Sequence, residues 1–292
     1  MNIIVNLNKP KGITSQQAVT KVKKLLGVKK AGHTGTLDPM ATGVLLVCLN
    51  EATKISRFLL DKDKTYHARL KLGERTDTLD ADGKLIEIRD VPSFTAEHIV
   101  NVAKQFIGTI MQKPPMYSAV KLNGQPLYKL ARRGIEVERA KRPVEIYNIE
   151  LLQTDMPYVD IAVSCSKGTY IRTLCDEIGL MLGTGAHITA LERTSIGTFT
   201  IDASVPFDTI GQEISDDSPC VSSIDRALSD LSEVILDETD FRKARNGIPL
   251  SREIIHGIPD NICIRLKDPF GSLFGIGITK YDRIAIERNL NL

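Results

Sequence analysis

The 292-residue chain lacks the hallmarks of membrane and secreted proteins. Its apolar residues never run for the roughly 18 positions that a membrane-spanning helix needs. The N-terminal residues 1–6 contain neither the basic segment nor the small-residue cleavage site of a secretory signal. We therefore expect a cytoplasmic protein. With 42% apolar and 25% charged residues, its composition is that of an ordinary globular protein rather than a disordered one.

Cysteine is scarce, and its spacing fits none of the usual cysteine-based sites. The five cysteines are Cys48, Cys165, Cys175, Cys220 and Cys263. They form no CxxC pair, and they share no metal-ligand spacing with one another or with the histidines His67, His98, His187 and His256. Because their number is odd and the chain is long, a disulfide framework is not expected. We expect reduced, buried thiols and no metal site.

The chain also has little net charge, but its charges are unevenly distributed. It carries 38 Lys and Arg against 36 Asp and Glu, a net charge of +2. Residues 205–240 hold ten of the acids and a single base, which leaves 37 bases and 26 acids in the rest of the chain. The remainder is therefore basic and permits a polyanionic partner, although most charge clusters are simply solvated.

Apolar spacing predicts the elements of the first 110 residues. A helix is expected from residue 14 or 15 to about 26, ended by Gly27. The apolar run 44–49 predicts a strand buried on both faces, and the alternation in 65–72 predicts a half-buried strand. A second amphipathic helix is expected over residues 99–106.

The middle of the chain predicts two paired strands and a helix. Residues 145–152 and 158–165 are expected to pair, and the spacing of apolar residues predicts a helix over 169–182. The acidic stretch 208–220 is interpreted as a linker or a surface excursion. A short helix is expected near residues 224–231.

The sequence predicts two domains, at residues 1–235 and 236–292. The second is a small β-rich unit with strands at 262–266 and 274–278. Helices and strands do not alternate regularly along the first domain, so a doubly wound parallel sheet is not expected. We therefore predict an α+β fold with a mixed, largely antiparallel sheet.

One loop combines residues that rarely occur together. Residues 32–43 contain three glycines and three threonines around a single carboxylate, Asp38, and a buried strand follows at once. Glycines permit tight turns and close approach of a ligand, while Pro39 restricts Asp38 to extended conformations. An isolated Asp-Pro pair would be read as an ordinary turn. This setting instead favours a stiff loop that presents a functional carboxylate.

The same loop, from Gly32 to Gly43, closely resembles the catalytic motif of the TruB family of pseudouridine synthases. Further segments occur in the family's order, at 64–66, 73–83, 114–121, 127–134, 167–174 and 185–191. Together they span nearly all of residues 1–235, and the C-terminal unit resembles the small PUA RNA-binding module more weakly. The resemblance implies a pseudouridine synthase catalytic domain followed by a PUA-like domain, with no metal and no cofactor.

The resemblance also implies roles for individual residues. Asp38 is the expected catalytic carboxylate, Arg172 is its expected partner, and Tyr66 is expected to stack on the flipped uracil. A nearby guanidinium would lower the pKa of Asp38 and keep it ionised. The expected RNA-binding and pocket residues are His33, which would wedge into the RNA, together with Lys9, Tyr170 and Leu191. From the residues alone, Tyr66 would be interpreted as a core ring on an alternating strand, whereas for Leu191 an ordinary core role and a pocket role are about equally favoured.

The basic segment within the insertion at 123–145 is expected to contact RNA phosphates. Its candidate residues are Arg132, Arg133, Lys141 and Arg142. A solvated charge run is the alternative interpretation. One departure from the family stands at Glu192, where a basic residue is more common, so a phosphate contact near the active site is expected to be missing.

We therefore expect an enzyme that isomerises uridine 55 in the T loop of tRNA to pseudouridine, acting as a monomer without an obligatory protein partner. The C-terminal unit is expected to contact the acceptor end of the tRNA. Two alternatives are a guide-RNA-dependent pseudouridine synthase and a non-catalytic protein that binds and remodels tRNA. A pure binding protein has no need of a carboxylate that faces a phosphate backbone, which argues against the second alternative.

Overall fold

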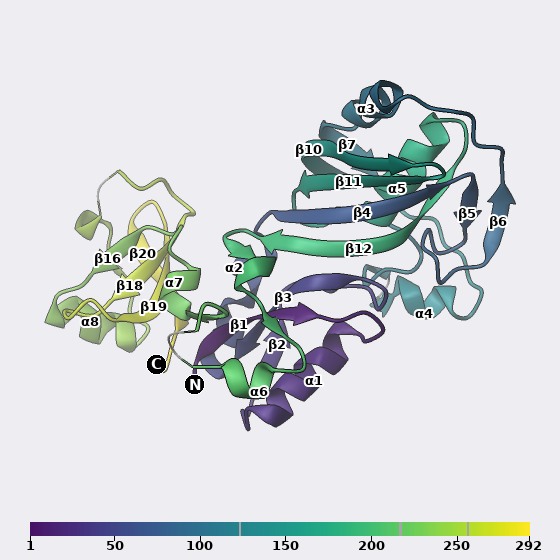
Figure 1. Ribbon diagram of the computed structural model, residues 1–292. Coiled ribbons are helices and arrows are strands. Elements are labelled where there is room, and N and C mark those ends of the chain that lie inside the picture. The colour runs from purple at the N-terminus through teal and green to yellow at the C-terminus, as the bar shows by residue number, and fades with distance from the viewer. Residues whose placement is uncertain (123, 216–217, 256) are drawn as a thin grey trace.

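The computed structural model describes residues 1–122, 124–215, 218–255 and 257–292 and contains two units (Figure 1). Outside the described residues lie His256, Asp216 and Asp217 of the acidic stretch, and Asn123 of the basic insertion. The larger unit is built on an eleven-stranded sheet and the smaller on a five-stranded sheet. No helix in the described ranges is both long enough and apolar enough to traverse a membrane.

The larger sheet is mixed and largely antiparallel, which confirms the predicted fold class. In spatial order its main path runs through β14 (Val205–Pro206), β1 (Ile3–Lys9), β3 (Thr42–Leu49), β12 (Ala186–Ile196), β4 (Lys64–Leu72), β11 (Tyr158–Cys165), β10 (Arg142–Asp155) and β7 (Gly108–Gln112). Three more strands pair beside this path, namely β2 (Ala31–His33), β13 (Phe199–Thr200) and β15 (Val221–Ser223). The pairs β1–β14 and β3–β12 are parallel, and the other pairs of this sheet are antiparallel.

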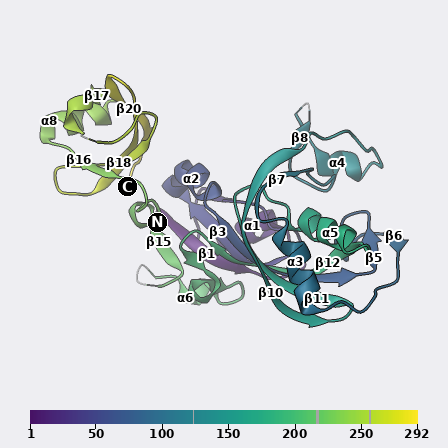
Figure 2. The same ribbon diagram turned by 90° about the horizontal axis from the view of Figure 1, so that it is seen from above.

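Two hairpins and the second sheet complete the strands. The hairpins are β5 (Glu74–Thr76) with β6 (Leu85–Ile88), and β8 (Lys121–Leu122) with β9 (Gln125–Pro126). The smaller sheet has the order β16 (Glu233–Ile235), β18 (Cys263–Lys267), β19 (Leu273–Thr279), β20 (Arg283–Asn289) and β17 (Leu250–Ser251). Seen from above, this sheet and the segment that carries β8 and α4 lie at opposite ends of the molecule (Figure 2).

The helices are short, and those that begin at Ser15, Ala96, Ile171 and Ile224 lie at predicted positions, whereas the others were not predicted from the sequence. In chain order the helices are α1 (Ser15–Leu25), α2 (Ser56–Leu60), α3 (Ala96–Lys104), α4 (Leu127–Ala131), α5 (Ile171–Met181), α6 (Ile210–Glu213), α7 (Ile224–Ala227) and α8 (Glu238–Arg245), with 3₁₀ turns η1 (Asn50–Ile55), η2 (Ile201–Ala203) and η3 (Arg252–Ile254). Helix α1 begins at a capping box, in which the Thr14 side chain and the Gln17 side chain each bond the other's backbone N–H. Gly27 follows the helix with a φ of 62°, as its place at the predicted end requires.

Strand β3 separates two hydrophobic cores. Its side chains alternate, so Leu45, Val47 and Leu49 enter one core while Val44, Leu46 and Cys48 enter the other. The first core also takes buried side chains from α1, α3 and α5. The second lies between β3, η1, α2 and the C-terminal unit. The prediction of a strand buried on both faces is therefore confirmed.

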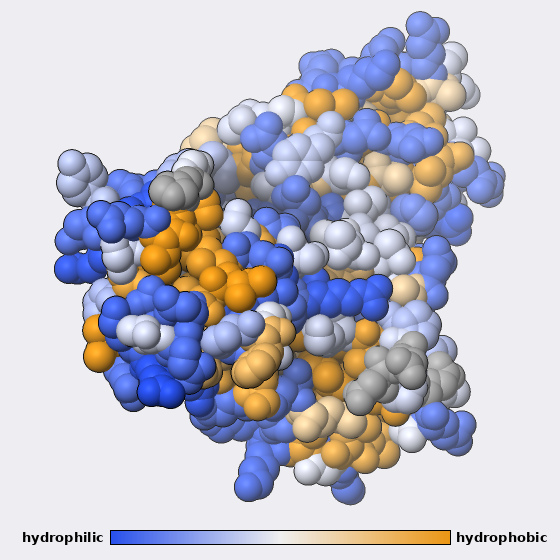
Figure 3. All heavy atoms as spheres, turned by 90° about the vertical axis from the view of Figure 1, so that its left-hand side faces the viewer, coloured by the Kyte–Doolittle hydropathy of each residue, from blue (hydrophilic) through white to orange (hydrophobic). Residues whose placement is uncertain are grey.

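The C-terminal unit is docked on the larger unit through the second core. Leu273, Ile276 and Leu290 of the smaller unit are buried there. Arg57 pairs with Glu287 at 2.9 Å across the junction, and the two chain ends lie close together (Figure 1). The far side of this unit, seen in Figure 3, shows apolar side chains gathered among hydrophilic ones.

The acidic stretch 208–220 is not a linker between the two units, which corrects one of the two interpretations. Both flanking strands, β14 and β15, pair with β1, so the segment begins and ends in the larger sheet. Ile210 is completely buried in the first core and holds α6 against the domain. Among the cysteines, Cys263 departs from the expected burial because it is only half-buried at the start of β18.

Candidate active site

The loop that carries Asp38 is tied to the start of α1. The buried Ser15 hydroxyl accepts a hydrogen bond from the Leu37 N–H at 2.8 Å and donates one to the Leu37 carbonyl at 3.0 Å. The Gly12 N–H donates to the Pro39 carbonyl at 2.8 Å, and the Ala41 N–H donates to the Asp38 carbonyl at 3.1 Å. These bonds leave the backbone around Asp38 little freedom, as the stiff-loop interpretation requires.

Arg193 holds the same loop from the sheet. Its side chain is almost fully buried, and it donates from Nε to the Val44 carbonyl at 2.8 Å and from Nη2 to the Gly35 carbonyl at 3.1 Å. Gly43 has a φ of 99°, and a Cβ at that position would lie 2.3 Å from the Arg193 carbonyl oxygen. The glycine of the motif is therefore required for both its conformation and the close approach of β12.

Asp38 is ion-paired with Arg172 inside a network of oxygen acceptors. Arg172 Nε lies 2.9 Å from Asp38 Oδ2, and only 4% of the Arg172 side chain is exposed. Its Nη1 donates to the Thr78 carbonyl at 2.9 Å and lies 3.3 Å from Asp80 Oδ2. Its Nη2 donates to the Tyr117 carbonyl at 2.7 Å. Arg172 is thus fixed by four oxygens, and Asp38 is one of them.

The electrostatic surroundings of Asp38 differ in part from the expectation. Burial raises the pKa of Asp38, and the neighbouring Asp80 carboxylate acts in the same direction. Arg172 and Lys9 oppose this shift, Arg172 more strongly. Arg172 therefore favours the ionised form as expected, but burial outweighs it and the net shift of the pKa is upward.

A cavity of about 520 Å³ has Asp38 and Arg172 in its wall. This volume lies within the range of small-molecule sites. Six residues predicted from the sequence meet there, namely Asp38, Tyr66, Arg142, Tyr170, Arg172 and Leu191. Tyr66 and Leu191 come from the neighbouring strands β4 and β12, and Tyr170 precedes α5. The cavity thus combines one carboxylate, three guanidinium-bearing residues and aromatic walls, the third guanidinium being that of Arg193.

Gln112 fixes the position of Tyr170, one of the aromatic residues in the cavity wall. Its amide oxygen accepts from the Tyr170 N–H at 2.7 Å, and its amide nitrogen donates to the Tyr170 carbonyl at 3.1 Å. The Gln112 residue, at the end of β7, is only 2% exposed. Because both backbone groups of Tyr170 are bonded to one rigid side chain, the start of α5 and hence Arg172 are fixed relative to the sheet.

Family models match almost the whole of the larger unit. The model described as the TruB family pseudouridylate synthase N-terminal domain matches residues 23–171. The model of the tRNA pseudouridylate synthase B C-terminal domain matches residues 172–236. The chain belongs to the TruB family.

Known proteins agree with this membership. The chain is 45% identical to a tRNA pseudouridine synthase B of Clostridium tetani over 91% of this chain and 92% of that protein. It is 44% identical to one of Clostridium acetobutylicum over 95% of both chains. A crystal structure of a Cbf5-Nop10-Gar1 complex has a chain that matches with a TM-score of 0.77 and 29% identity, covering 98% of this chain and 84% of that one. A structure of an H/ACA RNP bound to a substrate RNA containing 2'-deoxyuridine matches with a TM-score of 0.75 and 27% identity, covering 99% and 85%.

Two residues that the TruB resemblance assigned to RNA lie outside the cavity wall. Lys9 is completely buried, and its amine donates to the Pro10 and Ile13 carbonyls, each at 2.9 Å. Burial lowers the pKa of Lys9 to about 8, against the opposing attraction of Asp38. His33 is half-buried on β2, and burial lowers its pKa as well. Lys9 therefore acts on Asp38 through its charge rather than from the surface.

One residue of the basic segment lines the cavity that holds Asp38. Arg142 lines the cavity, whereas Arg132, Arg133 and Lys141 are exposed beyond it. Arg132 and Arg133 follow α4, where they form part of the molecular surface. The structure thus divides these candidates into one residue at the cavity and three on the open surface.

Three residues that matter to the site were not predicted. Asp80 was not assigned a role from the sequence, yet its carboxylate contacts Arg172. Arg193 lies two residues after Leu191 on β12 and therefore on the same face, a signal that strand alternation offered. Gln112 carries no sequence signal at all. The same alternation places Glu192 on the opposite face of β12 from Arg193, beside His67 and Arg69 in a different hollow.

The described part of the chain contains no group of three or more His, Cys, Asp or Glu side chains arranged to hold a metal ion. Asp77, Asp80 and Asp82 belong to the turn of the β5–β6 hairpin, which contains the Asp82-Gly83 pair typical of such turns. Within that turn Asp80 Oδ1 accepts from the Asp82 N–H at 3.2 Å. Asp77 Oδ1 likewise accepts from the Lys84 N–H at 2.7 Å, so the carboxylates of Asp77 and Asp80 stabilise the turn.

Proposed function

We propose that this protein converts uridine to pseudouridine in tRNA, at position 55 of the T loop. The observation that carries this proposal is the Asp38–Arg172 ion pair in a cavity of about 520 Å³ whose walls include Tyr66 and Leu191. Membership of the TruB family supports both the reaction and the class of RNA. Position 55 and the T loop are inferred from the family resemblance of the motif loop.

The reaction exchanges one bond of the nucleoside for another. The bond between C1′ of the ribose and N1 of uracil breaks, the bond between C1′ and C5 forms, and the proton on C5 is replaced by one on N1. A carboxylate suits this exchange because it can attack an electrophilic carbon and later leave. Attack at C1′, attack at C6 and removal of a sugar proton each require Asp38 to be ionised.

The target base has to leave its stack to reach Asp38. Flipping a base costs a few kcal/mol, and stacking on an aromatic ring returns about 1–3 kcal/mol. We assign the stacking ring to Tyr66, which lies in the cavity wall on β4. Tyr170 and Leu191 bound the same space, and Arg172 supplies the positive charge that favours the ionised form of Asp38. His33, near the start of the motif loop, is assigned the position vacated by the base.

The basic segment and the C-terminal unit extend the proposed RNA surface. Arg132, Arg133 and Lys141 are exposed and available to phosphates. In the C-terminal unit, Phe270 and Tyr281 are 91% and 90% exposed in the turns that flank β19. Such rings are suited to stacking on unpaired bases, which supports a contact with the acceptor end. We place the start of this unit just before β16, because that strand pairs with β18.

The two alternatives are less well supported. Sequence identity to the tRNA pseudouridine synthase B proteins is 44–45%, against 29% to the chain of the Cbf5-Nop10-Gar1 complex. This difference favours an enzyme that acts without a guide RNA. A non-catalytic binding protein would have no use for the Asp38–Arg172 pair in the cavity wall.

Substitution of Asp38 tests the proposal. A bare tRNA transcript labelled with tritium at C5 of uridine should release tritium to water with the wild-type protein, and carbodiimide mapping should locate the product at position 55. Asp38→Asn keeps the shape of the side chain but removes its charge, so we expect release to fall by roughly 10³-fold or more. Binding of the tRNA, measured by filter retention, should change less than threefold.

Asp160→Asn is the matched control. Asp160 forms a two-point ion pair with Arg69 on the other face of β4, away from the cavity, so its loss should leave the rate unchanged. Full activity of Asp38→Asn would show that another group performs the chemistry. Tritium release that depends on an added guide RNA would support the guide-dependent alternative instead.

A further inference from the structure

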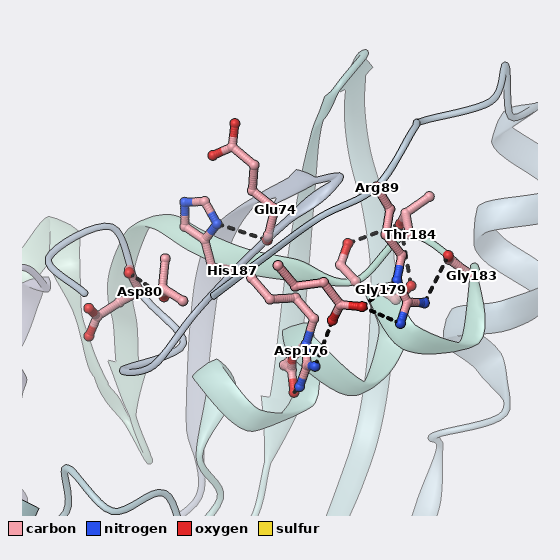
Figure 4. A network of polar contacts seen from close by, with 12 residues as sticks. Glu74, Asp80, Arg89, Asp176, Gly179, Gly183, Thr184 and His187 are labelled. Carbon is pink, nitrogen blue, oxygen red and sulfur yellow. Dashed lines mark hydrogen bonds and ion pairs between the residues drawn. The ribbon is translucent and has the colours of Figure 1, made fainter. Parts of the chain in front are cut away.

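A hairpin and its turn lie along α5, the helix that carries Arg172. Strands β5 and β6 are joined by the turn 77–84, and Figure 4 shows the polar contacts that surround this region. Three arginines link the two elements. Arg172 donates to the Thr78 carbonyl near the start of α5, Arg75 binds Asp176 one turn later, and Arg89 donates to the Gly183 carbonyl beyond its end at 3.1 Å.

The middle contact is the strongest of the three. Arg75 Nε lies 2.6 Å from Asp176 Oδ1, and Nη2 lies 3.0 Å from Oδ2, which is the two-point geometry of a strong guanidinium–carboxylate pair. Only 9% of the Asp176 side chain is exposed. Arg75 also binds Glu87 of β6 at 3.0 Å, so one guanidinium joins both strands of the hairpin to α5. Its aliphatic stem packs on Gly185, where a Cβ would lie 2.5 Å from it.

The turn 77–84 offers Arg172 two hydrogen-bond acceptors, and its backbone adopts a rarely populated conformation between them. Leu79 has a φ of 63°, a conformation that side chains with a Cβ rarely adopt. It separates Thr78, whose carbonyl accepts from Arg172, from Asp80, whose carboxylate lies 3.3 Å from the same guanidinium. The Thr76 hydroxyl holds the Asp80 carbonyl at 2.7 Å. A shift of this turn would therefore move both acceptors together.

Packing alone does not fix the turn. A hollow of about 480 Å³ lies beside it, with Asp77 and Leu79 of the turn and Arg75 and Asp176 of the ion pair in its wall. A segment that borders open space on one side has fewer van der Waals contacts to resist displacement. The Leu79 carbonyl accepts a hydrogen bond from the Ile188 N–H of β12 at 3.1 Å, and the Arg75–Asp176 pair adds a charged link from the hairpin to α5 at the edge of this hollow.

We propose that Arg75 and Asp176 are positioning residues for the isomerisation, which act on Asp38 through the turn 77–84, Asp80 and Arg172. The pair sets the distance between the hairpin and α5, and this distance decides whether Thr78 and Asp80 can orient the Arg172 guanidinium toward Asp38. Neither residue lines the cavity that holds Asp38. The inference rests on the proposed function, because its readout is the rate of pseudouridine formation.

Asp176→Asn and Arg75→Gln test the proposal by single-turnover tritium release from tRNA. Misplacement of a catalytic group by about 1 Å can cost about 100-fold in rate, so we expect each variant to lose about 10- to 100-fold. The dissociation constant for tRNA should change less than threefold, because neither side chain belongs to the proposed RNA surface. Asp160→Asn, which breaks an ion pair of the same two-point geometry with Arg69, should keep the wild-type rate.

The pH profile separates positioning from loss of fold. The charged groups that act on Asp38 are Arg172, Asp80 and Lys9, and Arg172 is the strongest of those that lower its pKa. If Arg172 is less well placed, this influence weakens, and the acid limb of the rate should move to higher pH in Asp176→Asn. A protein that is only partly folded would lose amplitude at every pH without moving the limb.

A double variant identifies the route of action. In the Asp80→Asn background the turn has already lost its charged contact with Arg172, so adding Asp176→Asn should reduce the rate by less than threefold. A full 10- to 100-fold further loss would overturn the proposed route through Asp80. A wild-type rate for both Asp176→Asn and Arg75→Gln would overturn the inference altogether, whereas the proposed function would fail only if Asp38→Asn stayed active.

Discussion

Lys9 is a buried amine whose charge is unfavourable in the folded protein. Its side chain is completely buried, and burial lowers its pKa from an ordinary 10.5 to about 8. Between these two values the unfolded chain binds more protons than the folded one, so stability increases with pH in this window. Below pH 8 both states are protonated, and the unfavourable effect of the buried charge is fully present and constant.

Lys9→Met should therefore change the shape of the stability curve. The unfolding free energy of the wild type should rise relative to the variant between pH 8 and 10, and the difference should stay level between pH 6 and 7.5. Urea denaturation of both proteins across this range is the measurement. Lys64, whose pKa burial also lowers to about 8, is present in both proteins, so its titration cancels. Parallel curves for the two proteins would contradict the prediction.

At the residue scale, sequence reasoning located the carboxylate but not all of its neighbours. Asp38 was identifiable because its loop combines several glycines and threonines with a single carboxylate, a combination that is unusual in an ordinary turn. Tyr66, Tyr170, Arg172 and Leu191 followed from the family resemblance, and the cavity brings them together. The contact of Arg172 with Asp80 depends on a turn 92 residues away in the chain, and no local pattern encodes such a contact.

At the scale of one element, Gly43 of the motif loop and Gly108 at the start of β7 are needed for different reasons. Gly43 and Gly108 have nearly the same φ, 99° and 100°, but a Cβ on Gly43 would meet the Arg193 backbone while a Cβ on Gly108 would meet nothing within 4 Å. Backbone strain of about 1–2 kcal/mol therefore applies to both, and a steric clash applies only to Gly43. The two positions form a matched pair in which the clash is the single difference.

Gly43→Ala should thus destabilise the protein well beyond Gly108→Ala. We expect a loss of about 1–2 kcal/mol for Gly108→Ala and at least about 3 kcal/mol for Gly43→Ala, measured by denaturant unfolding. Gly43→Ala should also lower the rate of pseudouridine formation, because it displaces the strand that follows Asp38. Equal losses at the two positions would mean that β3 and β12 can separate without cost.

Periodicity predicted the elements better than it predicted their connections. The alternation in 65–72 and the helical spacing in 169–182 match β4 and α5 closely, because each element buries one face along its own length. The structure of residues 208–220 was predicted less well. Its polar composition suggested a linker, but the chain returns to β1 on both sides of it, and Ile210 anchors it in the core. Pairing between strands that are distant in the sequence produces no apolar periodicity within either segment, so it could not be predicted locally.

On the scale of the whole molecule, the two units share a core. Strand β19 has one face in the C-terminal unit's own core, through Phe274, and another in the core shared with the larger unit, through Ile276. Ion pairs reinforce this junction, since Asp225 of α7 binds both Arg265 and Lys267 of β18. A unit attached through a common hydrophobic core is expected to unfold together with its neighbour rather than alone.

Ile276→Ala and Ile264→Ala distinguish the shared core from the local one. Both side chains are completely buried, Ile276 in the shared core and Ile264 in the C-terminal unit's own core, so each truncation should cost about 2–5 kcal/mol where it acts. In hydrogen exchange, Ile276→Ala should reduce protection in β3 as well as in β19, because Leu46 of β3 belongs to the same core as Ile276. Ile264→Ala should reduce protection in the C-terminal strands first.

If Ile276→Ala leaves β3 unchanged, the two units are coupled only through their surface ion pairs, and the proposed tRNA surface is then carried by two bodies that can move independently.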